Sequence, residues 1–122
     1  MRWSQSELDA YTARIQAARA PDDSPDPGPE SMLQRKIVKW AHDNGYPILS
    51  FPRTPKIKSV LPAGWPDVCL ILKNKVLFCE LKAGKGRLSK DQEHLRLQFM
   101  ALGHEIFEVR SFKRFLEIVR EV

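Results

Sequence analysis

The fold is decided by the stretch Gly64-Trp65-Pro66-Asp67-Val68-Cys69-Leu70-Ile71-Leu72, then Lys73-Asn74, then Lys75-Val76-Leu77-Phe78-Cys79-Glu80-Leu81-Lys82. Both apolar runs are about as long as a strand and are rich in β-branched and large apolar residues. Lys73-Asn74 has the length of a two-residue hairpin turn, so residues whose numbers sum to 147 should face each other. The stretch therefore predicts an antiparallel hairpin in a fixed register.

In this register, two acidic side chains and a lysine meet where the hairpin opens. Asp67 lies directly opposite Glu80, with side-chain roots roughly 5 Å apart. Lys82 points to the same face because it follows Glu80 by two residues. Two close carboxylates repel each other unless a cation compensates them, and Mg²⁺ or Mn²⁺, which prefer oxygen ligands, suit this role. The arrangement indicates metal-assisted phosphodiester hydrolysis. The plain alternative is a surface aspartate and a Glu-Lys pair at a sheet edge.

The remaining patterns predict an α/β fold with the element order α-β-β-β-α-β and a further C-terminal helix. Amphipathic or capped runs indicate the helices, and short apolar runs indicate the strands. The additional expected elements are a helix at 30–44, a strand at 47–51, a helix at 89–102, a strand at 106–109 and a helix at 111–122. Because the last strand follows a crossover helix, we expect a mixed sheet flanked by helices on both faces. The expected core-facing helix residues are Leu33, Ile37, Trp40, Ala41, Phe112, Phe115, Leu116 and Val119.

Residues 1–29 differ in character from the remainder. Residues 4–19 predict a short helix that opens with a Ser4/Glu7 capping box. Residues 20–29 hold four prolines and three aspartates, which predicts a linker. Residues 30–122 hold 17 basic and 10 acidic side chains, a net charge of +7. A basic domain around an acidic centre suits a nuclease, whereas a charge that only aids solubility is the alternative.

Gly64-Trp65-Pro66-Asp67 and Glu80-Leu81-Lys82 resemble the signature of the PD-(D/E)xK nucleases and, more narrowly, of the virus-type replication-repair nuclease (VRR-NUC) family. The resemblance runs from about residue 30 to the C-terminus. It includes Glu30, which is followed by Gln34 at the start of the first helix, and the run Leu88-Ser89-Lys90-Asp91-Gln92. It implies a restriction-endonuclease-like core and a nuclease domain at 30–122, preceded by a separate segment at 1–29.

The resemblance also implies a role for each motif residue. Asp67, Glu80 and the backbone carbonyl of Leu81 would hold Mg²⁺ or Mn²⁺, and Glu30 would complete the metal site directly or through water. Lys82 would be the catalytic lysine. The alternative for Glu30 is a first-turn acid that interacts with the helix dipole.

Gln92 would support this centre from the helix that follows the hairpin. A Ser89/Gln92 capping box explains the same residue without any catalytic role. The two roles are compatible with each other.

The function implied by the resemblance is that of a metal-dependent, structure-selective DNA endonuclease in replication, recombination or repair. Single-domain members resemble virus-encoded homodimers that resolve four-way (Holliday) junctions. Residues 1–29 are a candidate dimerisation element. The alternatives are a non-catalytic or partner-activated DNA-binding module, and a nuclease of the flap or restriction type.

Two basic segments are candidate contacts for the DNA backbone. The loop at 52–63 carries Arg53, Lys56 and Lys58, and the glycine-containing segment at 82–87 carries Lys85 and Arg87. Solvated surface loops are the alternative for both. Trp65 is expected to pack within the fold rather than stack on a base. The three histidines, His42, His94 and His104, show no partner spacing and are expected to be structural or exposed.

The two cysteines predict free thiols. Cys69 should face Phe78, so Cys79 projects from the opposite sheet face, and a disulfide is not expected. No apolar run approaches the ~18 residues of a membrane span, and no signal peptide opens the chain. We therefore predict no membrane partner and a cytoplasmic location, which for a phage-encoded chain is the host cytoplasm.

Overall fold

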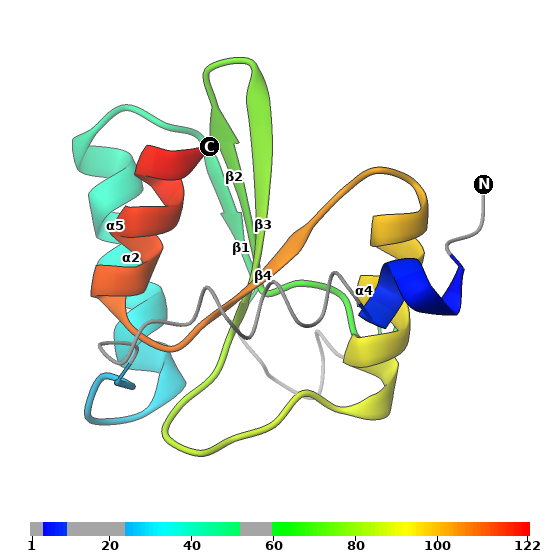
Figure 1. Ribbon diagram of the computed structural model, residues 1–122. Coiled ribbons are helices and arrows are strands. Elements are labelled where there is room, and N and C mark those ends of the chain that lie inside the picture. Colours follow the sequence, from blue (N-terminus) through cyan, green and yellow to red (C-terminus); the bar gives the residue numbers. More distant parts are fainter. Residues whose placement is uncertain (1–3, 10–23, 52–59) are drawn as a thin grey trace.

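The computed structural model of the protein describes residues 4–9, 24–51 and 60–122. These residues form an α/β fold with a four-stranded mixed sheet flanked by helices (Figure 1). The elements are α2 (Glu30–Asp43), β1 (Ile48–Ser50), β2 (Val68–Leu72), β3 (Lys75–Leu81), α4 (Lys90–Ala101), β4 (Ile106–Val109) and α5 (Phe112–Glu121). The predicted order α-β-β-β-α-β with a final helix is confirmed.

The strands lie side by side in the order β1-β2-β3-β4. β1 pairs antiparallel with β2 and β2 pairs antiparallel with β3, whereas β4 pairs parallel with β3. The parallel pair follows from α4, because a crossover helix returns the chain to the same end of the sheet. In the hairpin, Val68 pairs with Cys79 and Leu72 pairs with Lys75, which confirms the predicted register. Asn74 in this turn has a φ of 61°, in the left-handed region that asparagine adopts more readily than most residues.

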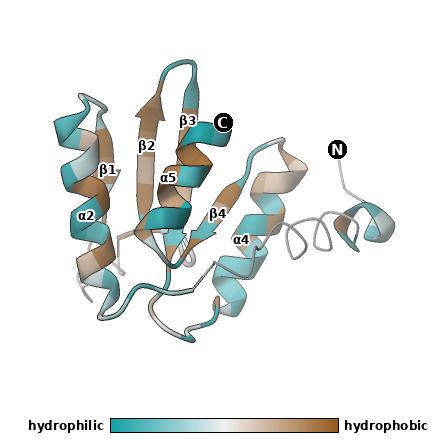
Figure 2. Cartoon of the chain, turned by 60° about the vertical axis from the view of Figure 1, so that its left-hand side comes forward, coloured by the Kyte–Doolittle hydropathy of each residue, from teal (hydrophilic) through white to brown (hydrophobic). Residues whose placement is uncertain are grey.

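Helices α2 and α5 lie together on one face of the sheet, and α4 lies on the other (Figure 1). Strand residues whose side chains point to the α2/α5 face are almost fully buried: Val68, Leu70, Leu77, Cys79, Leu81 and Val109. Figure 2 shows β2 in hydrophobic colours along its length, while α4 is mostly hydrophilic. The main core therefore lies between the sheet and the α2/α5 pair.

The helix stripes agree closely with the sequence pattern. In α2, Leu33, Ile37 and Ala41 are buried, and Trp40 packs edge-on against Phe115 with ring centroids 5.2 Å apart. In α5 the buried residues are Phe115 and Ile118, while the predicted Phe112, Leu116 and Val119 are partly buried against the same core. The pattern missed Ile118, which is almost fully buried.

A smaller aromatic cluster fills the space between the sheet and α4. Phe99 of α4 meets Trp65 at 5.6 Å and Phe78 at 5.2 Å between ring centroids, both in edge-to-face geometry. Trp65 therefore packs within the fold, as predicted. These contacts hold α4 against one face of the sheet. Glu80 points to this face because it follows Phe78 by two residues on β3, and Asp67 points there because the register places it opposite Glu80.

Part of the N-terminal segment lies within the described residues. Residues 5–9 are helical, and Ser4 and Glu7 form the predicted capping box with hydrogen bonds of 3.1 and 3.3 Å. Asp26, in the predicted linker, donates its N–H to the Arg110 carbonyl and accepts the Phe112 N–H, both at 2.9 Å. Residues 10–19 of the predicted helix lie outside the described part of the chain.

Two further predictions concern the cysteines and the membrane. Cys69 and Cys79 are free thiols on opposite sheet faces, as expected. No helix in the described ranges is both long enough and apolar enough to cross a bilayer.

Replacing Phe115 with alanine should lower the free energy of unfolding by about 3–5 kcal/mol, because the ring is fully buried between α2 and the sheet. Urea unfolding followed by circular dichroism measures this loss. Leu102→Ala is the matched control, since Leu102 is 73% exposed and its loss should change stability by no more than about 0.5 kcal/mol. Equal losses in both variants would contradict a core between the sheet and the α2/α5 pair.

Candidate active site

The two acidic residues lie at the end of the hairpin that opens toward α4. Asp67 immediately precedes β2, and one further step of the register places it opposite Glu80. The Asp67 carbonyl accepts the Phe51 N–H at 2.9 Å, on the β1 side, so Asp67 and Glu80 form a non-hydrogen-bonded pair. Side chains approach most closely in such pairs, with Cα atoms roughly 4.5 Å apart. Asp67 and Glu80 are 6% and 3% exposed, so two buried carboxylates lie side by side.

Pro66 explains why the backbone ladder stops at this point. The next step of the register places Pro66 opposite Leu81, where two residues would normally exchange two backbone hydrogen bonds. Proline has no N–H and cannot donate to the Leu81 carbonyl. The Leu81 N–H donates instead to Oδ2 of Asp67 at 2.8 Å. The Asp67 carboxylate is thereby held by β3, while the Leu81 carbonyl receives no hydrogen bond from Pro66.

Gln92 connects Glu80 to the start of α4. Its side-chain Nε2 donates to Oε2 of Glu80 at 2.8 Å. Its Oε1 accepts the Ser89 N–H at 2.9 Å, and its own N–H donates to Ser89 Oγ at 3.2 Å, which completes the predicted capping box. One side chain therefore both caps the helix and orients the carboxylate.

Gly64 allows the loop before β2 to lie directly against this helix start. Its φ is +82°, and a Cβ at this position would lie 2.4 Å from the Asp91 carbonyl oxygen and 2.7 Å from the Gln92 nitrogen. Any side chain would therefore push apart two backbone segments. The glycine of the motif thus sets the distance between the Asp67 loop and Gln92.

Lys82 completes the group of residues that the structure brings together. It follows β3 directly, its N–H donates to the Val109 carbonyl at 3.0 Å, and it is 6% exposed. A Cβ on Gly86 would lie 3.8 Å from Cδ of Lys82, so the turn after β3 lies beside this side chain. Lys82 follows Glu80 by two residues, so its buried side chain starts from the same sheet face as the two carboxylates.

The pKa of the Cys79 thiol responds to the nearby carboxylates of Asp67 and Glu80. Burial raises the pKa of Cys79, and the negative charges of Asp67 and Glu80 raise it further. Burial also raises the pKa of Cys69. Both thiols are therefore protonated at neutral pH and are poor nucleophiles or metal ligands.

A second acid-base triplet lies beside the first. Glu80 is in register with Glu108 of the parallel strand β4, so Glu108-Val109-Arg110 runs alongside Glu80-Leu81-Lys82. Glu108 pairs with Arg110 and also with Arg96 of α4, the latter at 3.8 Å between Nη1 and Oε2. This network was not predicted from the sequence, although the Glu-x-Arg spacing of β4 repeats the Glu-x-Lys spacing of β3.

The motif residues Glu30 and Gln34 both lie on α2. Glu30 is the first residue of α2 and is half-buried, and Gln34 of the same helix donates to Ser50 Oγ and the Phe51 carbonyl. Within residues 4–9, 24–51 and 60–122, no three side chains of His, Cys, Asp or Glu form a group that could hold a metal. The role of Glu30 as a ligand therefore stays a prediction.

The predicted DNA contacts divide into two sets. Lys85 and Arg87 are exposed in the turn after β3. Arg53, Lys56 and Lys58 lie outside the described residues. The three histidines, His42, His94 and His104, are exposed, as expected.

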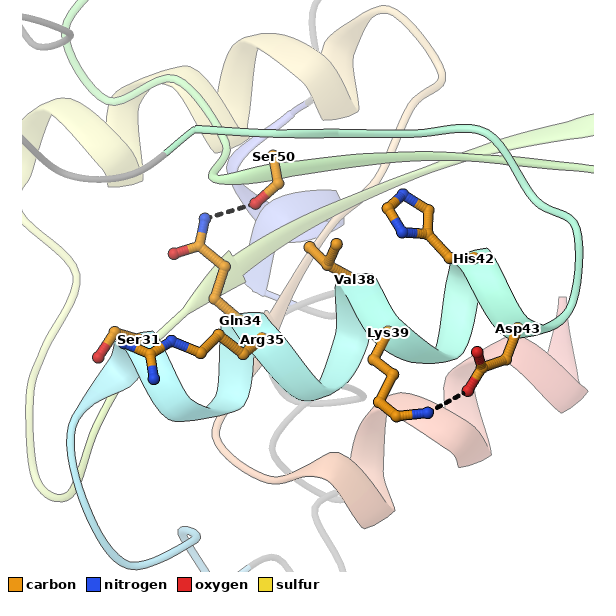
Figure 3. Close-up of a pocket in the computed structure, with 8 residues that line it drawn as sticks. All are labelled: Ser31, Gln34, Arg35, Val38, Lys39, His42, Asp43 and Ser50. Carbon is orange, nitrogen blue, oxygen red and sulfur yellow. Dashed lines mark hydrogen bonds and ion pairs between the residues drawn. The ribbon is translucent and has the colours of Figure 1, made fainter.

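A separate hollow of about 660 Å³ runs along α2 beside β1 (Figure 3). It is lined by Ser31, Gln34, Arg35, Val38, Lys39, His42, Asp43 and Ser50. Lys39 pairs with Asp43 at 2.6 Å, and Gln34 reaches across to Ser50 at 2.6 Å. Asp67, Glu80, Lys82 and Gln92 are not among the residues that line it.

Comparison of the chain with models of protein families, with curated proteins and with solved structures found no match. The resemblance to PD-(D/E)xK nucleases therefore depends on the motif residues and their order. The geometry adds that Asp67, Glu80, Lys82 and Gln92 gather at one end of one sheet face.

Replacing Gly64 with alanine should destabilise the fold by roughly 1–3 kcal/mol more than the same change at Gly103. Both glycines have a positive φ, but a Cβ on Gly103 would meet no atom within 4 Å, so the difference isolates the contact with α4. Urea unfolding measures the stability, and the Gln92 side-chain amide signals in NMR spectra report its contact with Glu80. Equal destabilisation in both variants, with unchanged Gln92 signals, would show that the close approach is unimportant.

Proposed function

We propose that this protein is a metal-dependent DNA endonuclease with a PD-(D/E)xK core. The observation that carries the proposal is the pair of buried carboxylates, Asp67 and Glu80, oriented by neutral donors beside a buried lysine. The Leu81 N–H and the Gln92 amide each direct one carboxylate oxygen, so these contacts orient the pair for a cation.

The donor set fits Mg²⁺ or Mn²⁺, which take carboxylate, carbonyl and water oxygens. Asp67, Glu80 and the Leu81 carbonyl would hold the ion, and Pro66 supports this because proline has no N–H to donate to that carbonyl. Glu30 would complete the site directly or through water. When bound, the ion would lower the pKa of a water molecule and stabilise charge on the phosphoryl oxygens.

The protein side chains supply orientation and charge. Lys82 would stabilise negative charge that develops on the phosphate, or orient the attacking water. Gln92 would keep Glu80 in position through its amide, and the Leu81 N–H would do the same for Asp67. Such preorganisation reduces the rearrangement needed during the reaction.

DNA is the proposed substrate because the charge of residues 30–122 is strongly positive around this acidic centre. Lys85 and Arg87 would contact backbone phosphates next to the site, and Arg53, Lys56 and Lys58 are candidates in the loop before β2. Within the VRR-NUC resemblance, we propose a homodimer that cuts both strands of a four-way junction, with residues 1–29 as a candidate dimer contact. Flaps and linear duplexes are the alternative substrates.

A DNA-binding module without catalysis is the second candidate. It is favoured by the described residues, which bring only two carboxylates together rather than three metal ligands. Partner-supplied activation would belong to the same class. The two candidates differ in whether DNA is cut when Mg²⁺ or Mn²⁺ is supplied.

End-labelled four-way junction, flap and linear duplex DNA incubated with Mg²⁺, Mn²⁺ or EDTA should separate these functions. We expect paired nicks in the junction that disappear with EDTA, and a cleavage rate lowered roughly a hundredfold or more in Lys82→Ala. Lys75→Ala is the matched control, because it removes the same charge at the opposite end of β3. If the junction is bound but survives with both metals, the catalytic proposal fails and the binding module replaces it.

Isothermal titration with Mn²⁺ tests the carboxylate ligands directly. Asp67→Asn and Glu80→Gln should lose most of the metal affinity yet keep DNA binding, because removing negative charge does not weaken contact with a polyanion. Lys82→Ala should leave metal binding largely intact. Asp43→Asn, which changes an exposed acid on α2, is the control. Wild-type affinity in Asp67→Asn would remove that residue from the proposed metal site.

A further inference from the structure

Arg110 joins two parts of the molecule that are far apart in sequence. Its Nε donates to Oε1 of Glu108 at 2.8 Å, and Nη1 donates to the Gly84 carbonyl at 2.9 Å. Nη2 donates to both the Gly86 carbonyl and Glu108. Every nitrogen of the Arg110 guanidinium group therefore donates a hydrogen bond. Two of the acceptors are backbone carbonyls in the turn after β3.

The turn that Arg110 holds is the one that carries the exposed cations. Gly86 donates its N–H to the Ala83 carbonyl at 3.0 Å, and Gly84 has a φ of +51°, so the turn depends on a left-handed residue. Lys85 lies between the two anchored glycines. The turn is short and solvent-exposed, so without an anchor its backbone would exchange among several conformations.

Glu108 keeps the guanidinium in place. Its side chain is 8% exposed and lies between Arg110 and Arg96 of α4. Planar guanidinium groups suit this geometry because their donors form a rigid fork, which a lysine ammonium cannot reproduce. The parallel pairing of β3 and β4 brings the fork to the turn, because Leu81 is in register with Val109.

We propose that Arg110 is a positioning residue that fixes the turn at 83–87 and so presents Lys85 and Arg87 to a DNA phosphate beside the active site. That Arg110 fixes the turn follows from its own contacts. That the turn presents Lys85 and Arg87 to a phosphate rests on the proposed function. The guanidinium acts through the turn and does not itself touch the substrate.

Amide hydrogen exchange of the free protein, without metal or DNA, tests the anchoring. In Arg110→Ala and Arg110→Lys, exchange of the Gly86 N–H should rise by about tenfold, as expected when a charge-assisted anchor is lost. Arg110→Lys keeps the positive charge beside Glu108 and guards against general unfolding. The matched control is Arg114→Ala, because Arg114 is similarly exposed (20% against 19%) and pairs only with α5 acids in the described contacts.

Binding of labelled junction DNA in EDTA, measured over a range of salt, tests the presentation. Arg110→Ala should lower the slope of log affinity against log salt by about one to two, as should the double variant Lys85→Ala/Arg87→Ala. Combining all three changes should lower the slope no further than the double variant, because Arg110 acts through these two side chains. Mn²⁺ affinity should stay at the wild-type value.

Unchanged Gly86 exchange in both Arg110 variants would overturn the anchoring role. If the triple variant lowers the slope of log affinity against log salt by the sum of the Arg110→Ala effect and the double-variant effect, Arg110 contacts DNA independently. That result would overturn its role in presenting Lys85 and Arg87. If the wild-type protein binds no DNA while Gly86 exchange rises as expected, the proposed function fails and the anchored turn stands. These outcomes separate the two proposals.

Discussion

The two-residue turn at Lys73-Asn74 is the constraint on which the rest of the structure depends. It fixes the β2/β3 register, and alternate residues of a strand point to opposite sheet faces. The same register therefore buries Val68 and Cys79 under α2 and α5 and places Asp67 opposite Glu80 on the α4 face. A slip by one residue would put carboxylates into the main core and expose apolar side chains. Fold and site thus cannot be changed independently here.

The start of α4 is the second element that serves both stability and the site. Helix N-termini leave N–H groups that need acceptors, and the Ser89/Gln92 capping box supplies them. The Gln92 amide nitrogen remains available to hold Glu80. The Gly64 backbone then lies directly against this helical turn, which no other residue type would allow. A local capping motif and a close approach of two backbones together bring α4 to the acidic pair.

Sequence reasoning worked where the determining signals are local. The turn length, the Ser89/Gln92 spacing and the alternation of apolar residues each act within a few residues, and the predicted register and element order are confirmed. It failed where distant segments meet. Asp26 capping α5 and Arg110 anchoring the turn after β3 both depend on tertiary packing that no short pattern encodes. Glu30 illustrates the same limit, because its place relative to Asp67 is set by how α2 packs rather than by its own neighbours.

The two neighbouring acid-base triplets show why a motif needs its surroundings. Glu108 is bound by the two cationic groups of Arg96 and Arg110, which balance its charge and give it a structural task. Glu80 and Asp67 accept hydrogen bonds from the neutral Gln92 amide and the Leu81 N–H, which direct the two carboxylates. Equal spacing therefore occurs in two different sets of contacts. An ion pair network stabilises the turn next to one triplet. At the other, two buried carboxylates accept hydrogen bonds from neutral groups, and a divalent cation and a phosphate would be stabilised together there if the proposed function holds.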